Sequence, residues 1–128
     1  MNTIVLDTDV LINFLRGNEE ARDFLHSVLD ESVLCCSAIT VAELYAGMRP
    51  PEAERTGELV DGLHVIDCDR RIAEKAGLYK ASTKSQQLDL DDCIIAATAA
   101  VNNGTLATGN GKHYAIRDIR KIIVKMNR

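Results

Sequence analysis

The chain has 128 residues, a length that fits one domain with its own hydrophobic core. Hydrophobic residues make up 46% of the sequence and charged residues 27%, which is typical of a globular protein and excludes a long disordered segment. The formal net charge of -4 excludes nucleic-acid binding through an overall basic surface, so any such contact must use local clusters of basic residues.

Short β-rich runs alternate with longer helical patterns along the chain, which predicts a parallel sheet covered by helices. Residues 3–6 (TIVL) form the first predicted strand, and a helix follows at once and ends near Gly17. Asn18 then caps a second predicted helix, which extends to about Leu29.

The middle of the chain continues this alternation. Residues 32–37 (SVLCCS) form the second predicted strand, and a helix is expected over residues 40–48, before two consecutive prolines. A short helix over residues 51–62 and a third strand over residues 64–68 (HVIDC) follow. Asp69 is expected to cap the next helix.

The last part of the chain begins with a polar loop, residues 82–87. A helix over residues 88–104 opens with acids and closes with Asn-Gly, and two further strands are predicted at residues 105–108 (TLAT) and 121–126 (KIIVKM). Because connections between parallel strands are right-handed, we expect ligands to bind outside the carboxyl ends of the strands.

The sequence also bears on the cellular compartment. No apolar run is long enough to span a bilayer and no signal peptide opens the chain, so we expect a cytoplasmic protein without membrane contact. The four cysteines show neither a Cys-x-x-Cys pair nor a secretory framework, and we expect them to be buried free thiols: Cys35, Cys36, Cys68 and Cys93. A zinc site using Cys35, Cys36 and a histidine is the alternative.

Acidic residues stand where the predicted strands and helices meet. Asp7 ends the first strand, Glu43 lies one turn inside the helix after the second strand, and Asp92 lies in the first turn of the helix before the fourth. We therefore expect all three at one rim of the sheet. Each also has a purely structural explanation, as a helix cap (Asp7), a capping box (Thr40-x-x-Glu43) or a partner of a helix dipole (Asp92).

The neighbours of these three acids are apolar, which predicts that the carboxylates are buried. Several carboxylates in one pocket repel one another and take up protons unless a divalent cation neutralises them. Hard oxygen ligands suit Mg²⁺ or Mn²⁺. The combination of the three acids therefore favours a metal site over three unrelated helix caps.

Four segments, in this order, resemble the motifs of the PIN-domain ribonucleases, and most closely those of the VapC-type toxins of toxin–antitoxin modules: VLDTDVLI (5–12), ITVAELYAG (39–47), LDDCIIAATA (90–99) and LATGNGKHY (106–114). The resemblance covers nearly the whole chain. It implies a single PIN domain over residues 1–128, with a three-layer α/β/α fold built on a mostly parallel sheet of about five strands. It also implies a metal-dependent endoribonuclease that hydrolyses RNA phosphodiester bonds with Mg²⁺ or Mn²⁺.

The same resemblance implies roles for individual acids. Asp7, Glu43 and Asp92 would be the catalytic and metal-binding residues, with Asp7 and Asp92 as direct ligands. Glu43 would bind the metal through water or act as the general base. Asp91 takes the place of Asp92 if the helix register differs by one residue.

Other residues near these acids are assigned to substrate contact or to the outer shell of the metal. Thr8 would orient Asp7 through its hydroxyl, and Asp9 would be an outer-shell acid. In the fourth motif, His113 stands where many family members carry an aspartate three residues after the asparagine, here Asn110. Asn110 would contact the water shell of the metal or a phosphate oxygen, and His113 would contact the scissile phosphate or be an ordinary surface histidine.

The resemblance also implies partners: an RNA substrate, a cognate VapB-like antitoxin that covers the acids, and a second copy of the chain in a homodimer. RNA would meet basic groups on the rim of the cleft: Arg16, Arg49, Lys112 and His113. Four residues of the helical segments are candidates for apolar partner surface: Phe24, Leu25, Leu44 and Tyr45.

Two other interpretations remain open. Asp7-x-Asp9 after a strand also resembles the motif of haloacid-dehalogenase phosphatases, which use an aspartyl nucleophile, although Leu11 stands where that family usually has Thr or Val. The second is a non-catalytic PIN-like module that binds RNA or protein, which His113 in place of a fourth acid favours.

Overall fold

The computed structural model describes residues 1–82, 88–111 and 114–126 and contains one five-stranded sheet. Its strands are β1 (Asn2–Leu6), β2 (Ser32–Ser37), β3 (His64–Ile66), β4 (Thr105–Thr108) and β5 (Arg120–Ile123). Their order is β3-β2-β1-β4-β5, and every neighbouring pair is parallel. The parallel sheet expected from the alternating pattern is therefore confirmed. Most of the polar loop predicted at residues 82–87 lies outside the described residues.

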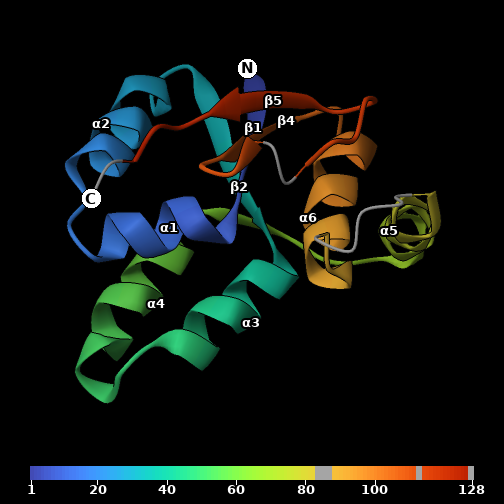
Figure 1. Cartoon of the computed structure of the whole chain (residues 1–128). Coiled ribbons are helices and arrows are strands. Elements are labelled where there is room, and N and C mark those ends of the chain that lie inside the picture. The colour runs from blue at the N-terminus through green and yellow to red at the C-terminus, as the bar shows by residue number, and fades with distance from the viewer. Residues whose placement is uncertain (83–87, 112–113, 127–128) are drawn as a thin grey trace.

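Helices cover both faces of this sheet (Figure 1). They are α1 (Thr8–Leu15), α2 (Glu19–Val28), α3 (Ala38–Gly47), the 3₁₀ helix η1 (Pro50–Glu52), α4 (Ala53–Asp61), α5 (Arg70–Ser82) and α6 (Leu90–Val101). In Figure 1, α5 and α6 lie on one side of the sheet and α1, α2 and α4 on the other. The three-layer α/β/α arrangement is confirmed.

The core consists of two apolar clusters, one on each face of the sheet. Since successive strand residues point to opposite faces, Val5 and Leu106 pack in the cluster with α5 and α6, whereas Ile4, Leu6 and Ala107 pack in the cluster with α1 and α2. Burial on both faces explains why the central strands have continuous apolar runs instead of an alternating pattern.

Helix α3 differs from the sequence prediction at its start. It begins at Ala38 because the Ser37 side chain caps it, accepting a hydrogen bond from the Ile39 amide at 3.2 Å. Thr40 is therefore inside the helix and buried, so Thr40 and Glu43 do not form the capping box that their spacing allowed. This frees the Glu43 side chain for another partner.

Strand β3 is also shorter than predicted, because it ends at Ile66. Cys68 consequently lies beyond the sheet and is exposed, so the expectation that it is a buried thiol is wrong. The other three cysteines are buried free thiols, as expected: Cys35, Cys36 and Cys93. Among the described residues, no helix combines the length and the hydrophobicity that are needed to cross a bilayer.

The strand order places a switch point at the centre of the sheet. From β1 the chain moves outward to β2 and β3, and it later returns to the other side of β1 to form β4 and β5. The Asp7 amide donates to the Ala107 carbonyl at 2.9 Å, which ties the carboxyl ends of β1 and β4 together. In open parallel sheets, ligands bind outside the carboxyl ends of the strands at such a switch point.

Candidate active site

Asp7 lies directly at the switch point. Its Oδ1 atom accepts a hydrogen bond from the Thr8 amide at 2.8 Å, which makes it the N-cap of α1, and its Oδ2 atom accepts one from the Thr108 hydroxyl at 2.8 Å. Only 6% of the residue is exposed. Burial, and then the charge of Asp9, raise the pKa of Asp7 to about 6. Capping alone does not require a carboxylate to be buried beside a second acid.

Asp9 lies in the first turn of α1 and is held by the chain after β4. Its carboxylate accepts the Gly109 amide, with 3.1 Å between the nitrogen and Oδ2. Burial raises the pKa of Asp9, and the charge of Asp92 adds to this effect. The structure therefore brings Asp9 to the same place as Asp7 and Asp92.

Glu43 reaches this place from α3. Its Oε1 atom lies 2.7 Å from the Thr8 hydroxyl, which must donate because a carboxylate only accepts. The same hydroxyl lies 3.0 Å from the buried Thr40 hydroxyl. Partial burial raises the pKa of Glu43, with smaller contributions from Asp91, Asp92 and Asp7. Thr8 thus orients Glu43 through its hydroxyl and contacts Asp7 through its backbone amide, which corrects the role expected for it.

Asp92 enters the site from the first turn of α6. Its Oδ1 atom accepts a hydrogen bond from the Tyr114 hydroxyl at 3.2 Å, and Tyr114 is fully buried. Asp91, its neighbour, is exposed, although its charge acts on Glu43. The helix register therefore places Asp92 half-buried beside Tyr114 and Asp91 at the surface, so the burial expected for Asp92 is only partial.

Two further residues contact the acids, Thr108 and Tyr114, and a third, Thr40, contacts the Thr8 hydroxyl. The register of β1 and β4 pairs Leu6 with Ala107, so the next residue of each strand, Asp7 and Thr108, must be neighbours. A parallel β1–β4 pairing assumed from the sequence would have identified Thr108. For Tyr114 the only signal is that a buried tyrosine hydroxyl needs a polar partner.

The remaining candidates lie in the loop after β4. Asn110 is exposed, and its backbone amide donates to the Thr108 hydroxyl at 3.0 Å. Asn110 therefore supports the residue that holds Asp7, while its side chain lies at the surface. Lys112 and His113 lie outside the described residues.

The donor set is suited to a divalent cation in its chemistry. Carboxylate oxygens from α1, α3 and α6 and the end of β1 are hard ligands. Within the described residues, no ion pair includes Asp7, Asp9 or Glu43. The same residues contain no group of three acidic, histidine or cysteine side chains spaced to hold a metal as they stand. Coordination by more than two acids therefore requires movement of their side chains.

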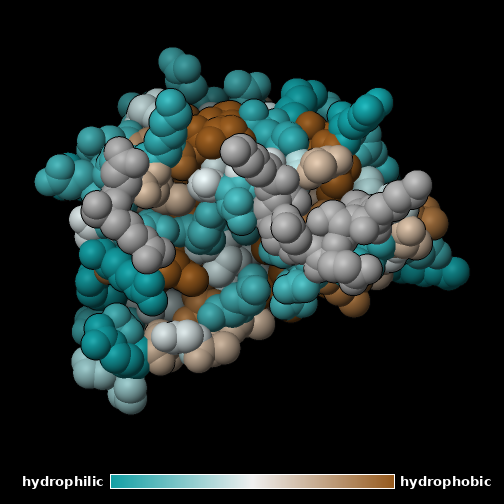
Figure 2. Space-filling view, in the orientation of Figure 1, coloured by the Kyte–Doolittle hydropathy of each residue, from teal (hydrophilic) through white to brown (hydrophobic). Residues whose placement is uncertain are grey.

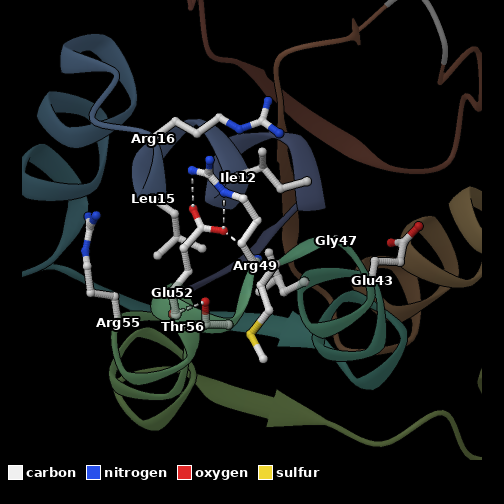
Figure 3. Close-up of a pocket in the computed structure, with 11 residues that line it drawn as sticks. Ile12, Leu15, Arg16, Glu43, Gly47, Arg49, Glu52, Arg55 and Thr56 are labelled. Carbon is white, nitrogen blue, oxygen red and sulfur yellow. Dashed lines mark hydrogen bonds and ion pairs between the residues drawn. The ribbon is translucent and has the colours of Figure 1, made fainter.

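Hydrophilic residues gather in the middle of the face shown in Figure 2, over the region where α1, α3 and α6 approach one another. Beside this region lies a cleft of about 450 Å³ between α1, α3 and α4. Figure 3 shows three arginines around Glu52, namely Arg16, Arg49 and Arg55. Glu43 lies at the opposite side of the cleft. Arg49 pairs with Glu52 at 3.3 Å. The cleft therefore leads from a basic region toward the acids.

A buried aspartate with half-buried acids around it, at the switch point of a five-stranded parallel sheet, indicates the class to which the protein belongs. A PIN domain model matches residues 4–119, and the chain is a member of the PIN domain family. The resemblance of the four motifs to the PIN-domain family is confirmed, and the interpretation as a haloacid-dehalogenase phosphatase is wrong.

Within the PIN domain family, the chain is similar to several individual proteins. The chain is 37% identical over 113 residues to Ribonuclease VapC10 of Mycobacterium tuberculosis, a match that covers 87% of this chain and 85% of the relative. A toxin-antitoxin complex from Klebsiella pneumoniae contains a similar chain, with a TM-score of 0.77, 26% identity and coverage of 91% of this chain and 98% of that one. FitAcB from Neisseria gonorrhoeae is similar, with a TM-score of 0.77, 27% identity and coverage of 93% and 96%.

Proposed function

We propose that this PIN-domain protein is an endoribonuclease that hydrolyses RNA phosphodiester bonds with the help of Mg²⁺ or Mn²⁺. The observation that carries the proposal is the burial of Asp7 at the switch point, beside Asp9 and the Asp92–Tyr114 pair. A buried carboxylate with carboxylate neighbours is costly unless a cation balances it. The similarity to Ribonuclease VapC10 supports RNA as the substrate.

Asp7 and Asp92 are the residues that would hold the cation directly. The Thr8 amide and the Thr108 hydroxyl fix the two oxygens of Asp7, and the Tyr114 hydroxyl contacts Asp92. A bound divalent cation supplies positive charge that acidifies water and offsets the charge of the reacting phosphate. Asp9 adds negative charge close by and would bind through water.

Glu43 would act as the general base. The Thr8 hydroxyl holds one of its oxygens, which leaves the other to accept a proton from the attacking water. Burial raises the pKa of Glu43, which makes its carboxylate a stronger base than an exposed glutamate. No covalent intermediate with the protein is required.

RNA would reach the acids through the arginine-lined cleft. Arg16 and Arg55 are exposed and line the cleft that Glu43 also lines. Guanidinium groups bind phosphate oxygens with two parallel hydrogen bonds, so these side chains would hold the backbone next to the bond that is cut. The net charge of -4 makes such a local contact necessary.

We further propose that the protein is the toxin of a toxin–antitoxin module, bound by a VapB-like antitoxin, dimeric and cytoplasmic. The similarity to a chain of the Klebsiella pneumoniae toxin-antitoxin complex supports the partner. Of the residues expected to form apolar partner surface, Leu25 and Leu44 are buried in the core, Phe24 is partly buried and Tyr45 is exposed. Of these four residues, only Tyr45 therefore offers substantial apolar surface.

The test is cleavage of RNA by the purified protein with Mg²⁺, Mn²⁺ or a chelator, alongside Asp7→Asn and Asp92→Asn. We expect cleavage that requires the cation and is lost in both variants. Asp61→Asn is the matched control, since Asp61 is exposed at the end of α4 and should cleave like the wild type.

Circular dichroism establishes that each variant is folded before its activity is compared. A wild type that cuts no RNA with either cation would contradict the proposal, as would folded Asp7→Asn and Asp92→Asn variants that cut at the wild-type rate. The PIN-like binding module would then be the better description.

A further inference from the structure

Tyr114 is a buried tyrosine whose hydroxyl reaches the acids. It follows β4 in the segment where the family resemblance places a fourth acid, and its side chain is completely buried. The hydroxyl lies 3.2 Å from Asp92 Oδ1 and also makes a side-chain hydrogen bond with Asp7. One neutral hydroxyl therefore contacts two carboxylates that come from different ends of the chain.

The position of this hydroxyl is fixed from both ends of the residue. The ring packs in the core cluster beneath α6, together with Ile95 and Leu106. The Tyr114 carbonyl accepts a hydrogen bond from the Lys121 ammonium group, which ties the loop to β5. Since neither the ring nor the backbone is at the surface, the hydroxyl cannot turn away from the acids without disturbing the core.

A hydroxyl in this place does what a further carboxylate cannot. It donates its one proton to Asp92, which lowers the cost of keeping the acids side by side, and it adds no negative charge. A tyrosine hydroxyl has an ordinary pKa of about 10, so it keeps its proton at neutral pH.

We propose that Tyr114 is a positioning residue of the active site, whose hydroxyl holds Asp7 and Asp92 in the arrangement in which both bind one divalent cation. The inference rests on the cation dependence of the proposed function and adds a residue that the four motifs do not assign. Groups that hydrogen-bond to metal ligands set ligand orientation, and their loss weakens metal binding about 10- to 100-fold.

Tyr114→Phe tests the proposal because it removes the hydroxyl and keeps the ring. Tyr79→Phe is the matched control: Tyr79 is also buried and its hydroxyl also donates to an aspartate, Asp118, at 2.8 Å, but this pair makes no contact with the acids. Titration calorimetry with Mn²⁺ and no RNA measures the cation affinity of each protein. We expect Tyr114→Phe to bind Mn²⁺ at least about 10-fold more weakly and Tyr79→Phe to match the wild type.

A double variant separates positioning from a general loss of stability. If Tyr114 acts through the two aspartates, adding Tyr114→Phe to Asp92→Asn should weaken Mn²⁺ binding much less than adding it to the wild type. The Mn²⁺ concentration that gives half-maximal RNA cleavage should rise in Tyr114→Phe, and saturating Mn²⁺ should restore most of the rate.

The outcomes are distinct. Wild type and folded Tyr114→Phe with equal Mn²⁺ affinities would overturn the role of Tyr114 and leave the proposed function intact. If Tyr114→Phe lowers Mn²⁺ affinity by the same factor in the wild type and in Asp92→Asn, the role of Tyr114 is also overturned. A wild type that binds no Mn²⁺ but cleaves RNA would contradict the cation dependence of the proposed function, and the role of Tyr114 would be overturned with it.

Discussion

Asp7 loses most of its contact with water but keeps hydrogen-bond partners, namely the Thr8 amide and the hydroxyls of Thr108 and Tyr114. These partners favour the charged carboxylate, whereas burial and the charge of Asp9 oppose it more strongly, so the pKa rises to about 6. The residue is therefore built to carry a charge that the protein alone does not balance.

We expect Asp7→Asn to stabilise the protein in the presence of a chelator. The pKa of Asp7 is raised from 3.8 to about 6 on folding, so the folded chain binds more protons than the unfolded chain in this window, and the wild type loses stability as the pH rises through it. Asparagine avoids this cost. We expect a gain in unfolding free energy of about 1–2 kcal/mol at about pH 7.5, because the full electrostatic cost of about 3 kcal/mol is partly offset by weaker hydrogen bonds.

Urea unfolding with chelator at about pH 4 and about pH 7.5 measures this gain. The gain should be much smaller at the lower pH, where Asp7 of the folded wild type is largely protonated and no longer carries the charge that burial opposes. A variant that is equally destabilised at both pH values would show that the carboxylate is not strained by its burial.

The Thr8 hydroxyl gives a second prediction. Thr8→Val removes the donor that holds Glu43 at 2.7 Å, so kcat for RNA should fall by about 10-fold or more. Because Thr8 is buried beneath the acids, KM for RNA should change little. Thr8→Ser retains the hydroxyl and is the control. Steady-state RNA cleavage by the wild type, Thr8→Val and Thr8→Ser measures kcat and KM. If kcat falls as much in Thr8→Ser as in Thr8→Val, the Thr8 hydroxyl does not orient Glu43.

At the scale of elements, the site consists of strand ends and first helical turns. The turn after β4 is tightly packed: a methyl group on Gly109 would lie 2.9 Å from Asp9 Oδ2 and would also meet the flexible end of Met126. The same glycine donates its amide to Asp9. Glycine at this position lets the backbone come close enough to hold the acid.

Gly109→Ala should therefore push Asp9 out of place. We expect RNA cleavage to fall several-fold and the unfolding free energy to fall by about 1 kcal/mol, since the carboxylate must move and lose the amide. Gly77→Ala in α5 is the matched control: a methyl group there meets nothing within 4 Å, so the helix should gain about 0.5–1 kcal/mol and cleavage should not change. If Gly109→Ala cleaves RNA as fast as the wild type, Asp9 takes no part in the active site.

The elements also show what the sequence could and could not supply. Strands 32–37 and 105–108 were predicted with the bounds that the structure has, because their apolar runs are bounded by turn residues. The start of α3 was missed because Ser37 is both the last strand residue and the helix cap.

The acids could be placed at one rim from their positions at strand ends, whereas the partners of each oxygen could not. Thr8 contacts Glu43 over a separation of 35 residues and Thr108 contacts Asp7 over 101. Contacts of this kind depend on strand order and helix packing, which local patterns do not encode. Tyr114 was missed for the same reason, since its hydroxyl meets Asp7 after β1 and Asp92 in α6 only in the folded chain.

For the whole molecule, charge is the property that decides how RNA is approached. The net charge of -4 opposes a polyanion at long range, and the acids add local repulsion. The three arginines of the cleft must overcome this repulsion at short range. Binding should therefore be weak, sensitive to salt and dependent on a few side chains.

We expect Arg16→Ala with Arg55→Ala, in the inactive Asp7→Asn background, to weaken RNA binding by about 10-fold. The slope of log affinity against log salt should fall by about 0.7 for each phosphate contact that is lost. Arg22→Ala with Arg71→Ala removes the same charge from exposed positions on α2 and α5. In this control pair, the RNA affinity and its salt dependence should stay closer to those of the Asp7→Asn protein. Fluorescence anisotropy with labelled RNA at several salt concentrations measures both. Equal losses in the two pairs would mean that net charge, and not the cleft, governs binding.

The hydrogen bond between Thr108 and Asp7 spans 101 residues, and Tyr114 lies still further along the chain. While a ribosome is still synthesising β4, the residues that hold Asp7 and Asp92 do not yet exist as folded structure. The nascent polypeptide therefore lacks the complete acidic site during most of its own translation. On the proposed function, RNA cleavage can begin only when synthesis has passed the fourth strand, and the time before that is available for an inhibitor to be made.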